Sequence, residues 1–221
     1  MNPEVAVGDR VIRVPKILCV ARNYADHAKE MGTPVPKERI FFLKPTTALL
    51  PGGGTILLPA ESKRVEVETE LAVILKAGGR DVSAAKAVDL IGGYAVFFDI
   101  TARDLQSKAR EEGGPWTAAK GFDTFAPISK GVVAHRGIDP HGLSIRLRVN
   151  GVVRQDSNTS QMVFRIPQLI EASSRIMTLE EGDVLATGTP AGVWPIVSGD
   201  VLEAEISRVG TLRCNVASRN R

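Results

Sequence analysis

The sequence predicts an α+β fold that is predominantly β, with a few helices at the periphery. Three observations lead to this prediction. Short apolar segments of strand character recur along the chain, a strong hairpin signal stands at Asn150-Gly151, and few segments have helical spacing. The 221 residues suit one sizeable core, so we expect a single catalytic domain spanning residues 1–221.

The strands predicted in the first half of the chain are short apolar runs. Ile17–Ala21 has the composition of a buried strand. Val65–Leu75 is the longest candidate, because it alternates at first and then becomes wholly apolar, as a strand entering a core does. The remaining strand candidates here are Ile40–Leu43, Thr55–Leu58 and Gly92–Asp99.

Four segments favour helix. Asn23 is a plausible N-cap for the first, and Gly113-Gly114 followed by Pro115 would end the third. The predicted helices are Tyr24–Met31, a segment from Ser83 through Leu90, Thr101–Glu112 and Pro167–Met177.

The last third of the chain is predicted to be rich in strands. Leu143–Val149 and Val152–Gln155 flank Asn150-Gly151, a dipeptide that favours a two-residue hairpin turn. Two further strands are expected to start at Val184 and Val201, each after a Gly-Asp turn.

Composition excludes several classes of protein. The formal net charge of +3 is mild and the basic residues are scattered, so we expect no nucleic-acid partner. The longest apolar runs, such as Ile91–Phe98, are far shorter than the ~20 residues of a membrane helix. The N-terminus lacks the pattern of a signal peptide, so we expect a cytoplasmic protein with Cys19 and Cys214 as free thiols.

Carboxylates gather in one predicted strand and after another. Glu66, Glu68 and Glu70 alternate, so they share one face, and a cation between them would reverse their repulsion. Asp99 ends an apolar stretch, where a lone carboxylate is costly unless it is paired or binds a metal. A solvated strand face and a helix N-cap are the respective alternatives. Oxygen ligands favour Mg²⁺ or Mn²⁺, with Ca²⁺ as a structural alternative.

A histidine and a glutamate stand three residues apart in the first predicted helix. His27 and Glu30 therefore share a helix face, and a carboxylate beside an imidazole suits general-base activation of water. A solvated helix surface is the alternative interpretation.

Further polar residues lie within plausible reach of this chemistry. Lys120 could pair with the acidic residues or hold a substrate anion, and Arg103 and Gln106 share one face of the helix after Asp99. The turn Thr187-Gly-Thr-Pro190 could cradle a carboxylate with its amides and hydroxyls. Exposed surface residues and a turn without a ligand are the alternatives.

An ordered set of motifs covers about residues 15 to 216. The motifs are Cys19-Val-Ala-Arg-Asn-Tyr-Ala-Asp-His27-Ala-Lys-Glu30, Phe42-Leu-Lys-Pro45, Glu68-Thr-Glu70-Leu, Gly93-Tyr, Asp99-Ile-Thr-Ala-Arg103-Asp-Leu-Gln106, Lys120-Gly-Phe-Asp, Val149-Asn-Gly, Arg154-Gln155 and Thr187-Gly-Thr-Pro190. In this order they resemble the fumarylacetoacetate hydrolase family, in its short single-domain branch of acylpyruvate hydrolases and oxaloacetate decarboxylases.

This resemblance implies a β-roll of mixed sheets, usually in a homodimer. It implies metal ligands at Glu68, Glu70 and Asp99, a lysine beside the metal at Lys120, and a water-activating pair at His27 and Glu30. Residues expected to line the substrate pocket are Arg22, Arg103, Gln106 and Thr189. Glu66 falls outside the metal pattern, and Trp194 stands where many relatives have glycine, which affects the expected pocket size.

The implied function is Mg²⁺- or Mn²⁺-dependent hydrolysis of a carbon–carbon bond in acylpyruvates such as fumarylpyruvate or acetylpyruvate, giving pyruvate and a carboxylic acid. The same site could decarboxylate oxaloacetate, because both reactions need a stabilised enolate. The alternatives are a 2-keto acid isomerase or decarboxylase of aromatic-compound catabolism, a metal-dependent nuclease, and a non-catalytic metal-binding module.

Overall fold

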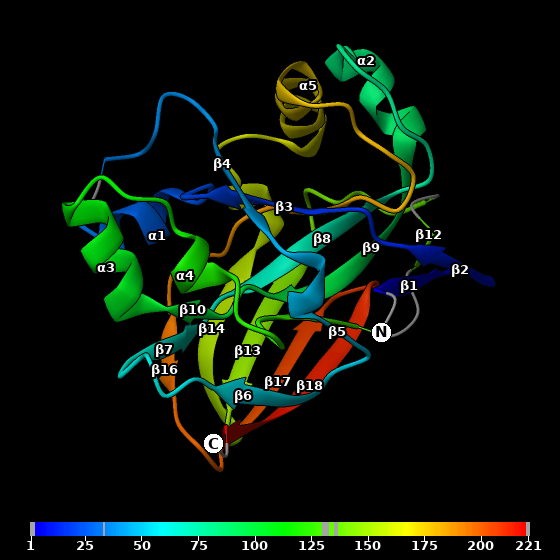
Figure 1. Ribbon diagram of the computed structural model, residues 1–221. Helices are drawn as coiled ribbons and strands as arrows, with labels where there is room; N and C mark the ends of the chain where they lie inside the picture. The colour runs from blue at the N-terminus through cyan, green and yellow to red at the C-terminus, as the bar shows by residue number, and fades with distance from the viewer. Residues whose placement is uncertain (1–2, 33, 130–132, 135–136, 220–221) are drawn as a thin grey trace.

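Two β-sheets that pack face to face form the body of the computed structural model, which describes residues 3–32, 34–129, 133–134 and 137–219 (Figure 1). Their facing side chains form the larger core, to which Leu71, Val96, Leu147 and Leu202 belong. The predicted α+β fold with predominantly β structure is confirmed, and the sheets are mixed as the β-roll expectation required.

The first sheet has eight strands. Its strand β15 runs parallel to β3 and β11 runs parallel to β5, while its other pairs are antiparallel. In spatial order the strands are β4 (Ile40–Lys44), β3 (Ile17–Ala21), β15 (Val184–Ala186), β8 (Thr69–Leu75), β9 (Ile91–Phe98), β11 (Ala126–Ile128) and β5 (Leu49–Pro51), and β12 (Val133–Ala134) also pairs with β9.

The eight-stranded sheet is buried on both faces. A second core lies on the face away from the other large sheet and includes Cys19, Ile74, Phe97 and Val184. Burial on both faces explains why β8 and β9 are continuous apolar runs, since neither face of these strands meets water.

The second sheet has five strands, in the order β14 (Val152–Asn158), β13 (Ser144–Val149), β17 (Val201–Ile206), β18 (Gly210–Ser218) and β6 (Gly54–Leu58). Buried and exposed residues alternate along β13 and β17, so only one face is covered. The predicted hairpin is confirmed between β13 and β14. Asn150 and Gly151 have φ values of 51° and 78°, the positive values that a type I′ turn requires.

Smaller elements surround these sheets. Strands β1 (Glu4–Val7) and β2 (Arg10–Arg13) form a hairpin, and β10 (Thr101–Ala102), β7 (Val65–Val67) and β16 (Trp194–Ile196) form a three-stranded sheet. The helices are α1 (Ala25–Glu30), α2 (Ala84–Ala87), α3 (Arg103–Glu111), α4 (Thr117–Lys120) and α5 (Ile166–Ile176), with 3-10 turns at Thr46–Ala48, Val88–Leu90 and Thr159–Gln161. Figure 1 places α1, α3 and α4 together at one side and α2 and α5 at the top.

Three local predictions were wrong. Val65–Leu75 is not one strand, because the chain leaves the three-stranded sheet after Val67 and joins the eight-stranded sheet at Thr69. The predicted helix Thr101–Glu112 starts only at Arg103, because its first two residues pair with β7. Asn23 does not cap α1, whose N-cap is Tyr24.

The sequence also led to expectations for membrane-spanning helices and for the two cysteines. Within the described ranges, every helix is too short or too polar to cross a lipid bilayer. Cys19 and Cys214 are both buried free thiols, as expected.

Candidate active site

The break between β7 and β8 brings two carboxylates side by side. Strands β8 and β9 are antiparallel, and Thr69 lies opposite Phe98. Glu68 precedes Thr69 and Asp99 follows Phe98, so both carboxylates stand at the same end of this strand pair. The Asp99 backbone N–H donates to the Glu68 carbonyl at 2.9 Å, which extends the ladder across the break.

Glu70 completes a triad with these two residues. One carboxylate oxygen from each of Glu68, Glu70 and Asp99 lies within 4.8 Å of the others. Glu68 is 5% exposed and the other two are 1% exposed, which rules out a solvated strand face. Asp99 is not a helix cap either, since Ala102 holds that position for α3.

Two cationic side chains neutralise Glu68. The Lys120 ammonium donates to Glu68 at 3.0 Å, to Asp99 Oδ2 at 2.6 Å and to the Thr101 hydroxyl at 2.6 Å. The Arg103 guanidinium donates to Glu66 at 2.6 Å and also to Glu68 and Gln106. Burial alone would raise the pKa of Glu68, but the charges of Lys120 and Arg103 outweigh burial and hold that pKa well below its ordinary value.

Glu70 has the opposite tendency. Burial, followed by the charges of Asp99 and Glu68, raises the pKa of Glu70 well above its ordinary value. A single backbone amide partly opposes this, because the Gly188 N–H donates to Glu70 Oε2 at 2.7 Å. In the turn Thr187-Gly-Thr-Pro190 this amide thus binds a carboxylate of the protein itself, and both threonine hydroxyls donate to backbone carbonyls.

Gly188 is the residue that permits this contact. Its φ of +93° lies in the region that favours glycine, and a Cβ at this position would stand 2.8 Å from the Asn23 Cβ. The Asn23 side chain in turn donates to the carbonyls of Thr187 and Phe164 at 2.8 and 3.0 Å. Asn23 therefore fixes this turn against the segment before α5.

The predicted histidine–glutamate pair is formed. The His27 Nδ1 lies 3.1 Å from Glu30 Oε2, and His27 is 6% exposed, so it is not part of a solvated helix surface. A carboxylate can only accept, so Nδ1 carries the proton and Nε2 is left as a base. The other Glu30 oxygen accepts from the Gly192 N–H at 3.0 Å, which ties α1 to the chain beyond Pro190.

One cavity of about 60 Å³ joins these groups. Nine of the ten predicted site residues line it, and only Glu30 does not. Arg22 enters it from the end of β3, with a positive φ of 57° that is uncommon for a residue with a side chain. Trp194 does not line this cavity. It is 36% exposed and stacks under the Arg154 guanidinium at 3.5 Å.

Two of the predicted substrate contacts have other partners in the structure. Arg103 is bound to Glu66, Glu68 and Gln106. The Thr189 hydroxyl donates to the Thr69 carbonyl and accepts from the Gln155 amide, both at 2.8 Å. Both residues face the cavity, but each also holds neighbouring parts of the site in place.

Sequence reasoning missed three neighbours of the triad. Phe42 and Trp116 line the cavity with their rings edge to face, 5.5 Å apart. Lys44 is buried beneath it, with its ammonium 2.8 Å from Asp99 Oδ1. Phe42 and Lys44 lie in the motif Phe42-Leu-Lys-Pro45. This motif pointed to the family, but it did not predict a role for either side chain.

The triad fits a hard divalent cation. All of its donors are oxygens, and among the described residues Asp99 Oδ1 has the Lys44 ammonium 2.8 Å away but no well-aligned hydrogen-bond donor. Burial and the neighbouring carboxylates raise the pKa of Glu70, and a bound cation would favour its ionised form. Mg²⁺ and Mn²⁺ both suit such a donor set.

Comparisons with known proteins agree with this geometry. Residues 16–217 match the family model described as fumarylacetoacetate (FAA) hydrolase C-terminal. The mitochondrial oxaloacetate tautomerase FAHD1 of Bos taurus is 46% identical over 200 residues, covering 90% of this chain and 90% of that protein.

Solved structures extend the comparison. Fumarylpyruvate hydrolase from Pseudomonas aeruginosa, in complex with Mn²⁺ and pyruvate, is 34% identical with a TM-score of 0.90, over 97% of this chain and 94% of that one. A 5-carboxymethyl-2-hydroxymuconate delta-isomerase from Mycobacterium smegmatis is 41% identical with a TM-score of 0.84, over 94% and 80% of the two chains.

Proposed function

The chain belongs to the fumarylacetoacetate hydrolase family, and we propose that it is a divalent-metal-dependent enzyme that forms the enolate of a short 2-oxo acid. One observation carries this proposal. The oxygen triad and the imidazole of His27 open onto the same small cavity, so an electron-withdrawing site and a base face one bound molecule.

Glu68, Glu70 and Asp99 would hold the ion, which we propose to be Mg²⁺ or Mn²⁺. When bound there, the ion would act as a Lewis acid toward the 2-oxo group of the substrate. Lys120 and Arg103 keep Glu68 ionised, and Arg22 at the cavity wall offers positive charge to a substrate carboxylate.

His27 would move protons in this site. With Nδ1 bonded to Glu30, its Nε2 can take a proton from a water molecule or from the carbon next to the 2-oxo group. The contact between Glu30 and Gly192 fixes the carboxylate that orients the imidazole. Both side chains of the pair are therefore needed for a well-placed base.

Hydrolysis of an acylpyruvate is the first proposed reaction. His27 would deprotonate a water molecule, the oxygen would attack the distal carbonyl, and the carbon–carbon bond would break to give a carboxylic acid and the enolate of pyruvate. Protonation of that enolate gives pyruvate. The similarity to fumarylpyruvate hydrolase supports this reaction.

Keto–enol exchange of oxaloacetate is the second candidate, with decarboxylation as a companion reaction. The 46% identity to an oxaloacetate tautomerase favours it, and a small cavity suits a four-carbon acid. Here His27 would remove and return the proton at C3. The similarity to an isomerase makes double-bond migration in an unsaturated 2-oxo acid a third candidate.

One experiment separates these reactions. Wild-type protein and the variant His27→Ala are given acetylpyruvate, fumarylpyruvate and oxaloacetate with Mn²⁺, with and without chelator, while pyruvate release and enol absorbance are followed. We expect chelator to abolish every activity, and His27→Ala to lower hydrolysis by about 10²–10⁴-fold with Mn²⁺ binding retained. Full turnover in chelator would contradict the proposal.

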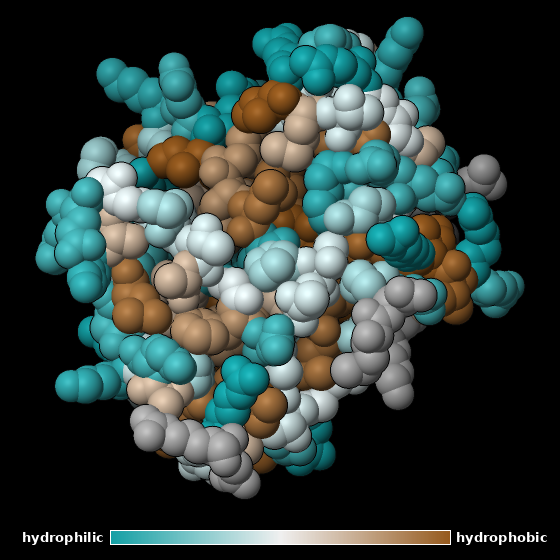
Figure 2. Space-filling model, viewed as in Figure 1, coloured by the Kyte–Doolittle hydropathy of each residue, from teal (hydrophilic) through white to brown (hydrophobic). Residues whose placement is uncertain are grey.

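Assembly and location also remain predictions. We propose that the chain acts as one domain in a cytoplasmic homodimer. Apolar side chains gather over the edge strand β4 below α5, as Figure 2 shows, and they line a groove of about 580 Å³ that includes Phe41, Leu43 and Ile176. An exposed edge strand with apolar neighbours supports association of two copies. Light scattering of the wild type tests it, and a monomeric mass would contradict it.

A further inference from the structure

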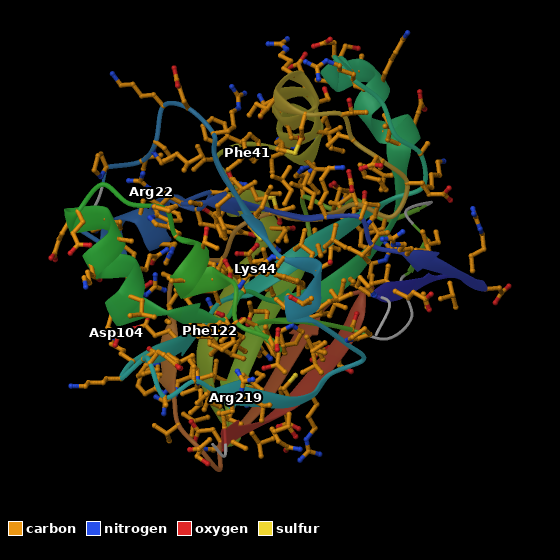
Figure 3. All side chains as sticks on the ribbon, viewed as in Figure 1. Arg22, Phe41, Lys44, Asp104, Phe122 and Arg219 are labelled. Carbon is orange, nitrogen blue, oxygen red and sulfur yellow. The ribbon has the colours of Figure 1, made fainter. Side chains whose placement is uncertain are left out.

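Lys44 is a buried lysine beneath the triad that the proposed chemistry does not use. It lies at the end of β4, near the middle of the molecule (Figure 3), with its side chain 0% exposed. A buried ammonium is costly unless every N–H is bonded, so its partners show what it stabilises.

Three backbone carbonyls receive its hydrogen bonds. The Lys44 ammonium donates to the carbonyls of Ile100, Lys120 and Phe125 at 2.9, 2.8 and 2.9 Å. Three acceptors require three N–H groups, which only the protonated form has. Lys44 thereby joins β4, the residue after Asp99, the last residue of α4 and the segment leading into β11.

Lys44 also forms an ion pair with Asp99. Its ammonium stands 2.8 Å from Asp99 Oδ1, but among the described residues no well-aligned hydrogen bond reaches that oxygen. Lys120 differs, because it donates directly to Asp99 Oδ2 and to Glu68. Lys120 thus bonds both carboxylates directly, whereas Lys44 supplies charge to Asp99 and sends its well-aligned hydrogen bonds to the main chain.

We propose that Lys44 is the positioning residue of the triad: through its three carbonyl partners and its ion pair it fixes Asp99 relative to Lys120 and presents Asp99 Oδ1 to the metal. This inference rests on the proposed metal site and goes beyond it, since Lys44 is neither a metal ligand nor a wall of the cavity. Residues that orient metal ligands commonly change metal affinity when they are replaced.

The test compares Lys44→Met with Lys16→Met, a matched lysine whose ion pairs lie at the far end of β8. Mn²⁺ binding is measured by calorimetry on protein shown to be folded by circular dichroism and cooperative urea unfolding. We expect Lys44→Met to raise the Kd for Mn²⁺ by about tenfold or more, with no change in Lys16→Met. An increase below about threefold would overturn the inference, and any larger one supports it.

If Lys44→Met does not fold, a crystal structure of the wild type with Mn²⁺ decides. An ion on Asp99 Oδ1, with Lys44 still bonded to its three carbonyls, supports the inference; an ion that contacts only Oδ2, or a displaced Lys44, overturns it.

The binding assay also separates this inference from the proposed function. Mn²⁺ binding that depends on Lys44, without turnover of any 2-oxo acid, would overturn the proposed reaction alone. Mn²⁺ binding that is insensitive to Lys44 would overturn this inference alone, and a wild type that binds no Mn²⁺ would overturn both.

Discussion

Two ionic clusters stand at opposite ends of β8, and each contains a lysine between two carboxylates. At the start of the strand Lys120 bonds Glu68 and Asp99 at 3.0 and 2.6 Å. Beyond its end, where the Leu75 N–H donates to the Asp183 carbonyl, Lys16 bonds Glu180 and Asp183 at 2.7 and 2.8 Å.

The clusters differ in burial and in the number of cations. Glu68 meets both Lys120 and Arg103, and its pKa is lowered although burial opposes this. Asp183 is buried beside Lys16, and burial raises its pKa despite that partner. The pKa shifts of the two carboxylates therefore differ in direction: two cations outweigh the burial of Glu68, and Lys16 does not outweigh the burial of Asp183. The Glu180 side chain is 58% exposed, so solvent stabilises its charge.

The largest expected difference between the clusters is in catalysis. Asp99→Asn should lower metal-dependent turnover by about a thousandfold or more, because the loss of a metal ligand removes several kcal/mol of transition-state stabilisation. Asp183→Asn, the same substitution in the other cluster, should leave turnover unchanged. Steady-state kinetics on oxaloacetate and acetylpyruvate with Mn²⁺ measures both. Full activity of a folded Asp99→Asn protein would refute the metal site.

A smaller difference is expected in stability. Lys120→Met leaves Asp99 and Glu68 buried with less compensation, so it should lower the free energy of unfolding of the metal-free protein by about 3–5 kcal/mol. Lys16→Met should have a smaller effect, since Glu180 is solvated and the buried Asp183, whose pKa is raised, still accepts the Glu180 N–H at 2.7 Å. Urea unfolding in chelator compares the two variants, and equal losses would show that burial does not distinguish the clusters.

The smallest expected effect is a pH dependence at Asp183. Its folded pKa lies above the ordinary 3.8, so the folded state binds the proton more tightly, and this group's contribution to stability is lost as pH rises through that window. Asp183→Asn lacks this titration. The Tm of the variant minus that of the wild type should therefore increase as pH rises from just below 3.8 to neutrality. A constant difference would contradict the raised pKa.

Sequence patterns located most strands of the two large sheets, because these strands have a local periodicity, but β5, β11, β12 and β18 were not predicted. The apolar runs of β8 and β9 and the turn at Asn150-Gly151 are examples. The family motifs supplied the residues that meet in one cavity, since spacing alone left each of them with a surface alternative.

The rest depended on contacts between distant segments. Nothing in the alternation of Val65–Leu75 marks the change of sheet at Glu68, which is set by pairing with Thr101 and Phe98. Asn23 is a residue type that often caps helices, but its side chain hydrogen-bonds the backbone of Phe164 and Thr187. Lys44 was missed because its partners are backbone carbonyls, which carry no sequence signal.

The backbone at Gly188 has a consequence for how such a protein can diversify. Any side chain there would collide with Asn23 and pull the amide away from Glu70. A substitution at this position is therefore expected to disturb the site, whereas Ala191 and Val193, which are partly exposed just beyond the turn, are expected to accept other side chains.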